Sequence, residues 1–101
     1  MCDNVKIYLP NTREVFVSKK KYIEFNKKYP GHWYATIKEY NECEKYIITT
    51  VLIENSVEKI SFYVTSYFTI DDYKIKEIKE YWGNNGEPPV WRVNEKLSER
   101  Y

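Results

Sequence analysis

The sequence predicts an α+β fold, in which one helix packs against a curled, cone-shaped sheet of antiparallel strands. Alternating apolar and polar residues mark six strand segments in a chain of 101 residues, the length of one domain. One segment, residues 18–29, instead has its apolar residues at helical spacing. The breaks between the last four strands are only a few residues long, so these strands are expected to run antiparallel to their neighbours.

The N-terminal part of the sequence predicts a hairpin followed by the helix. The stretch "VKIYLP" alternates apolar residues with others until Pro10 ends the strand. The stretch "EVFVSK" is the second predicted strand, hairpinned to the first. Ser18 is the expected N-cap of the helix, which ends at Pro30-Gly31.

The remaining sequence predicts four long strands in a meander, over residues 32–40, 46–54, 59–70 and 74–82. Strands of this length twist, so we expect the sheet to curl into a cone with an apolar mouth. Ile75 and Ile78 are three residues apart, which breaks the alternation and predicts a β-bulge between them. After the bulge, Ile78, Glu80 and Trp82 are expected to face the interior.

The composition argues against several classes of function. Sixteen Lys and Arg against 15 Asp and Glu give a net charge of +1, which favours neither nucleic acid nor membrane as a partner. No stretch is apolar enough to span a bilayer, and the N-terminus has no secretory pattern. Two cysteines and one histidine predict reduced thiols, no metal site and no cofactor in a cytoplasmic protein.

The strand over residues 60–70 has two different faces. One face is apolar, with Ser66 in its middle. The other face alternates tyrosine and threonine: Tyr63, Thr65, Tyr67 and Thr69. This second face is either an ordinary solvent-exposed surface or, as we prefer, the interface of a homodimer, because exposed aromatic rows on a long strand favour association.

Glu80 is the candidate catalytic residue. A carboxylate among apolar rings has a raised pKa and can donate or accept a proton. In the alternative interpretation, Glu80 pairs with Lys74 or Lys79 or faces solvent. The expected lining of an interior pocket consists of Trp33, Ser66, Phe68, Ile78, Glu80 and Trp82.

Two motifs near the C-terminus carry a family resemblance: Glu80-Tyr81-Trp82 at the end of the last strand, and Pro89-Val90-Trp91-Arg92 after the Gly83 to Gly86 segment. Together with "YLPNTREVFVSKKKYIEFNKKYPGHW", they make the sequence similar to SnoaL-like proteins of the nuclear transport factor 2-like (NTF2-like) superfamily. The resemblance covers nearly the whole chain and implies one domain over residues 1–101, with a cone-shaped fold that binds a small apolar ligand. Members usually begin with one or two helices, so this sequence resembles an N-terminally shortened member.

The same segment suggests how the chain ends. We expect a turn from Gly83 to Gly86 to reverse the chain, and Pro88-Pro89 to hold it extended. Trp91 would then cover the last strand as a clasp.

The catalytic residues of ketosteroid isomerases, a group of this superfamily, do not carry over. Their base, an aspartate before a proline, corresponds to Leu9 here, and their neutral acid corresponds to Ser66. Their tyrosine donor lies on the missing first helix, so we expect no such isomerase activity. Two hypotheses remain: a ligand-binding or interaction module, and an acid–base enzyme of isomerase, cyclase or hydrolase type that uses Glu80 with Tyr8 or Tyr81.

Overall fold

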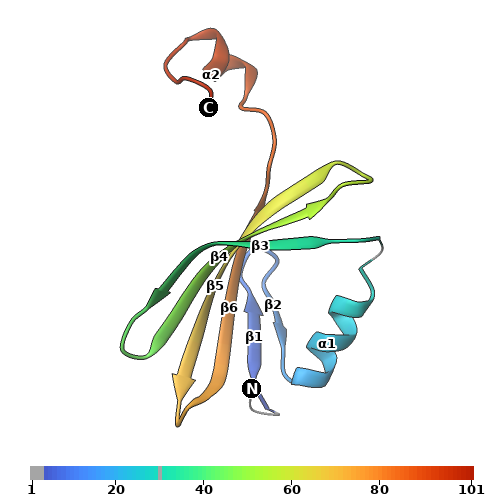
Figure 1. Ribbon diagram of the computed structural model, residues 1–101, viewed down its shortest axis with the longest axis vertical. Helices are drawn as coiled ribbons and strands as arrows, with labels where there is room; N and C mark the ends of the chain where they lie inside the picture. Colours follow the sequence, from blue (N-terminus) through green and yellow to red (C-terminus); the bar gives the residue numbers. More distant parts are fainter. Residues whose placement is uncertain (1–3, 30) are drawn as a thin grey trace.

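The computed structural model describes residues 4–29 and 31–101, and it confirms the α+β fold with one curled sheet (Figure 1). The strand order is β2-β1-β6-β5-β4-β3. The elements are β1 (Lys6–Leu9), β2 (Glu14–Phe16), α1 (Lys19–Lys27), β3 (Tyr34–Glu42), β4 (Tyr46–Asn55), β5 (Ile60–Asp71), β6 (Lys74–Asn84) and α2 (Val90–Asn94). Within the described residues, neither helix is long and apolar enough to cross a bilayer.

The sheet is mixed, which refines the expectation of antiparallel strands. β1 and β2 form the expected hairpin, and β3 to β6 form the expected meander. β1 and β6 run parallel, with Ile7 opposite Ile78. No turn joins these two strands directly, so the chain imposes no antiparallel direction on them.

The predicted bulge in β6 is confirmed. Thr69 pairs with Glu77 and Ile70 pairs with Ile75, which leaves Lys76 as the extra residue. Because of this extra residue, both Ile75 and Ile78 reach the core even though they are three positions apart.

The core is small and lies where α1 covers β1 and β6. Its buried members are Val5, Ile7, Leu9 and Ile78, and the partly buried residues packed on them are Phe16, Tyr22, Phe25, Phe68 and Ile75. The helix begins as predicted, because the Ser18 side chain accepts a hydrogen bond from the Lys21 backbone N–H at 3.3 Å. The rest of the sheet is more open to solvent than the part beneath the helix.

Gly31 lies against the side chain of Asn55, next to the turn between β4 and β5. Gly31 has a φ of +91°, and a Cβ atom there would lie 2.8 Å from the Asn55 amide nitrogen. The Asn55 side chain is 2% exposed and accepts hydrogen bonds from the backbone N–H groups of Val57 and Glu58. This contact fixes the chain just before Trp33.

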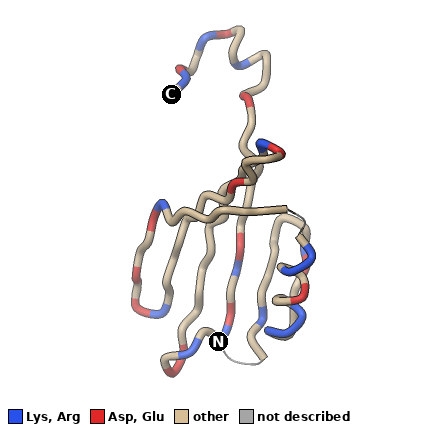
Figure 2. Tube along the Cα trace, turned by 45° about the vertical axis from the view of Figure 1, so that its right-hand side comes forward, with Lys and Arg blue, Asp and Glu red and all other residues tan. Residues whose placement is uncertain are grey.

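The C-terminal segment extends away from the sheet, so the expected clasp is wrong (Figures 1 and 2). β6 continues through Gly83 without a turn, and Trp91 is 60% exposed. The contacts of this segment are local and exposed: the Arg92 guanidinium lies 5.6 Å from the centre of the Trp91 ring, and Arg100 pairs with Glu87 at 2.6 Å. The Trp91 indole therefore does not pack on the last strand as expected.

Candidate functional site

The central strands β5 and β6 have two faces that differ in chemistry. The helix-side face carries the core and contacts α1, and its cross-strand pairs include Ser66 with Glu80 and Phe68 with Ile78. The outer face is formed by the intervening residues, whose pairs are Thr65 with Tyr81, Tyr67 with Lys79, and Thr69 with Glu77. Side chains of residues adjacent in the sequence therefore lie on opposite faces of the sheet.

All six residues predicted to line a pocket belong to the helix-side face: Trp33, Ser66, Phe68, Ile78, Glu80 and Trp82. Ser66 is buried directly opposite Glu80, and Ile78 is buried in the core. Trp33 and Trp82 both contact Phe62 at one end of this face. The structure thus groups these residues on one surface, and their role in binding a ligand stays a prediction.

A hydrogen bond across the site joins α1 to β6. The Tyr22 hydroxyl donates to Oε1 of Glu80, and both side chains are partly buried. In the part of the chain that the structure describes, Glu80 forms no ion pair with a lysine or arginine. Lys79 lies on the opposite face and Lys74 is opposite Asp71, so the alternative pairing of Glu80 with one of these lysines is not formed.

Burial sets the proton affinity of this pair. It raises the pKa of Glu80 above its ordinary value, and the hydrogen bond from Tyr22 offsets part of that rise. Burial and the neighbouring Glu80 carboxylate raise the pKa of Tyr22 as well. Tyr22 therefore remains a hydrogen-bond donor at neutral pH, and the Glu80 carboxyl holds its proton more tightly than an exposed glutamate does.

The tyrosine partner of Glu80 differs from the two named on sequence grounds. Tyr81 lies on the outer face because it neighbours Glu80 in the strand, and Tyr8 likewise alternates with the buried Ile7. Helical spacing places Tyr22 on the apolar side of α1. Helical spacing could therefore identify Tyr22 as a core-facing tyrosine, but it could not predict which strand α1 covers.

Aromatic rings continue from the helix along the helix-side face. Ring centres are 5.2 Å apart for Phe25 and Tyr29, and 6.3 Å apart for Tyr29 and Trp33. The row continues from Trp33 to Phe62 at 5.8 Å and from Phe62 to Trp82 at 6.4 Å. All four contacts are edge-on, the favourable geometry for such pairs. The Glu80 carboxylate is thus placed on a surface rich in aromatic rings.

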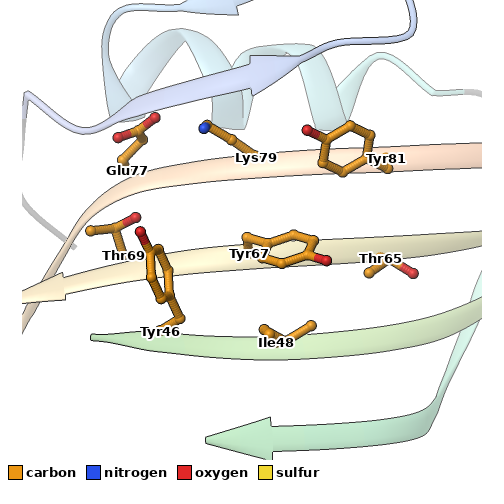
Figure 3. A pocket seen from close by; sticks show the side chains of 8 residues that line it. All are labelled: Tyr46, Ile48, Thr65, Tyr67, Thr69, Glu77, Lys79 and Tyr81. Atoms are coloured by element: carbon orange, nitrogen blue, oxygen red, sulfur yellow. The ribbon is translucent and has the colours of Figure 1, made fainter. Parts of the chain in front are cut away.

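The outer face holds an open hollow of about 620 Å³ (Figure 3). Side chains from β4, β5 and β6 line it: Tyr46, Ile48, Thr65, Tyr67, Thr69, Glu77, Lys79 and Tyr81. Three of the four residues predicted for a dimer interface are in this set, and Tyr63 lies on the same face beyond it. The sequence indicated the tyrosine–threonine ladder but not the hollow that neighbouring strands complete.

Neither a family model nor a curated protein matches the sequence. Solved structures do match. A candidate ketosteroid isomerase from Kribbella flavida DSM 17836 has a TM-score of 0.83 and 24% identity, over 100% of this chain and 72% of that one. An NTF-2 like protein of unknown function from Burkholderia xenovorans LB400 has a TM-score of 0.77 and 16% identity, over 99% of this chain and 76% of that one. At these identities the likeness establishes the fold, and this chain has the NTF2-like α+β cone.

Proposed function

We propose that this protein is a SnoaL-like module that binds a small apolar ligand on its helix-side face, without chemistry of its own. The observation that supports this most is the partly buried Glu80 carboxylate, hydrogen-bonded to Tyr22 on a surface of aromatic rings. Ligand sites typically combine apolar walls with a few placed polar groups. The two SnoaL-like motifs, Glu80-Tyr81-Trp82 and Pro89-Val90-Trp91-Arg92, agree with this assignment.

The ligand would rest beside Glu80, on the part of the face that α1 leaves open. Val64 and Val51 are paired across β5 and β4 there, and both remain partly exposed. Covering such apolar side chains is favourable by about 25 cal/mol per Å². The Glu80 carboxylate and the Tyr22 hydroxyl would orient a polar group of the ligand.

The test is an NMR titration with 2-naphthol, a neutral apolar ring with one hydroxyl group. Binding at the proposed site shifts the indole N–H signals of Trp33 and Trp82 and leaves the methyl groups of Ile48 unchanged, because Ile48 lines the outer hollow. Glu80→Gln is expected to weaken binding, and Glu77→Gln, on the outer face of the same strand, serves as the control. Shifts confined to the Ile48 side would contradict the proposal.

An acid–base enzyme is the second candidate function. It is favoured by the raised pKa of Glu80 beside a tyrosine donor, which together can move a proton at a bound ligand. The residues argue against isomerisation of a Δ5-ketosteroid, because Leu9, which is 5% exposed in the core, occupies the position of the family's base. We expect no turnover of such a steroid above the buffer rate, and a rate well above it would contradict this.

For the outer face we propose contact with a second copy of this chain. Tyr46, Tyr67 and Tyr81 are 46%, 38% and 45% exposed there. Glu77 and Lys79 are two positions apart on that face, so a two-fold axis between them would bring each against its opposite charge. Tyrosine and threonine side chains suit such a partly wet interface.

Sedimentation equilibrium tests this proposal. We expect a dimer at micromolar concentration, because pairing two copies covers the tyrosines of both. A folded species of 12.3 kDa at that concentration would rule it out.

A further inference from the structure

Resting on the ligand site proposed above, we infer that the natural ligand is an organic cation: a protonated or quaternary amine attached to an apolar ring system. The inference comes from the signs of the charges that the fold brings to the helix-side face and from the rings beside them. It goes beyond the NTF2-like fold, which says nothing about the charge of a ligand.

The charged side chains that the strands contribute to the helix-side face are acidic. The lysines of α1, which covers part of this face, are exposed at Lys20, Lys21 and Lys27 and half-buried at Lys19. Glu80 is opposite Ser66, and Glu42 belongs to the same face because its partner Ile47 is opposite Phe68. Each carboxylate accepts a hydrogen bond from a tyrosine hydroxyl: Glu80 from Tyr22 and Glu42 from Tyr40. Tyrosine satisfies a carboxylate oxygen but supplies no positive charge.

The lysines of β3 to β6 do not lie beside Glu80 on the helix-side face. β4 and β5 contain no lysine or arginine. In β6, Lys74 is opposite Asp71, Lys76 pairs with Asp71 at 2.7 Å, and Lys79 lies on the outer face. In β3, Lys38 is the unpaired residue of a bulge in the edge strand. A positive group brought by a ligand would therefore supply the charge that the residues beside Glu80 lack.

The rings near Glu80 favour the same ligand class. Trp82 is the next helix-side residue of β6 after Glu80, and it contacts Phe62, which contacts Trp33. The faces of tryptophan and phenylalanine rings attract ammonium groups, and the attraction increases when the cation is desolvated. An anionic ligand would meet Glu80 and Glu42 as like charges. A neutral ligand would gain only the hydrogen bonds of the Glu80–Tyr22 pair.

The experiment compares three ligands with the same ring: 1-naphthylmethylamine, 1-naphthalenemethanol and 1-naphthoic acid. Calorimetric titrations at neutral pH and low salt measure the dissociation constants. We expect the amine to bind on the order of ten-fold tighter than the alcohol, and the acid to bind weakest. Glu80→Gln should remove the preference for the amine, while Glu77→Gln should retain it. Glutamine still accepts the Tyr22 hydrogen bond, and a thermal melt of each variant verifies folding.

The outcomes separate this inference from the proposed function. If the alcohol binds as tightly as the amine at the indole groups of Trp33 and Trp82, the site exists and the inference about charge is wrong. If the amine preference survives in Glu80→Gln but disappears in Glu77→Gln, recognition occurs in the outer hollow and the inference is overturned. If all three compounds fail to bind the wild type, the proposed function fails, and the inference with it.

Discussion

The helix-side and outer faces of β5 and β6 are built from alternate residues of the same two strands, yet they differ in packing and in charge. The helix-side face contributes Ile78 and Ser66 at 3% and 6% exposure. The outer face leaves Tyr67 and Tyr81 at 38% and 45% exposure, beside the charged side chains of Glu77 and Lys79. Two neighbouring residues of one strand can therefore have different roles: one is buried and stabilises the fold, and the next is exposed and can contact a partner. Neighbouring substitutions should therefore have unlike effects.

The largest difference is expected between Ile78→Ala and Lys79→Ala. Removing the buried Ile78 side chain leaves a cavity in the core, so the free energy of unfolding should fall by about 2–5 kcal/mol. Lys79→Ala should change it by less than about 0.5 kcal/mol in the monomer, because the side chain is exposed. Urea denaturation followed by circular dichroism measures both, and equal losses would mean that the two faces are not distinct.

The second prediction concerns substitutions on the outer face alone. The double variant Tyr63→Glu/Tyr67→Glu should weaken the proposed dimer about 100-fold or more, equal to about 2.7 kcal/mol of binding, because four unpaired carboxylates would meet at the contact. Tyr73→Glu, on a fully exposed turn residue, is the matched control. Sedimentation velocity over a concentration series checks this. Association that survives the double change would place the contact on the other face.

The third prediction concerns the hydrogen bond between α1 and β6. Tyr22→Phe should cost about 1–2 kcal/mol of unfolding free energy, because a partly buried carboxylate loses its donor. It should also raise the pKa of Glu80 further, since that hydrogen bond lowers it in the wild type. Carbon-detected NMR of the carboxyl group measures the pKa. Tyr81→Phe on the outer face should change neither quantity, and a lower pKa in Tyr22→Phe would contradict the assignment.

The smallest effect is a pH dependence of stability. The pKa of Glu80 is higher in the folded state than in the unfolded state, so between these two pKa values the folded state binds more protons. The free energy of unfolding therefore decreases as the pH rises from the unfolded to the folded pKa. The Glu80→Gln variant lacks this decrease. Its stability relative to wild type should therefore increase as the pH rises from the ordinary carboxyl range through the folded pKa, and level off above it. A relative stability that decreases over that range would mean that the pKa is lowered instead.

The elements and the two faces of the sheet could be predicted because alternation in the sequence is a local signal. Ser18 as N-cap and the bulge beside Ile75 and Ile78 follow from such local rules. The contact of Tyr22 with Glu80 joins residues 58 apart, and no local pattern says which strand the helix covers. The path of the chain around Trp91 was mispredicted because no local pattern says whether the segment after β6 folds back onto the sheet or extends away from it.

The parallel pairing of β1 with β6 also constrains the order in which the protein folds. β3 to β6 are joined by short turns, so their pairings close small loops and can form early. The core, in contrast, needs Ile7 and Ile78 together, and these residues are far apart in the sequence. During synthesis, the N-terminal hairpin and α1 must therefore wait for β6, with their apolar side chains exposed until it arrives. Docking of that hairpin is expected to be the late, slow step of folding, and the stage most exposed to aggregation.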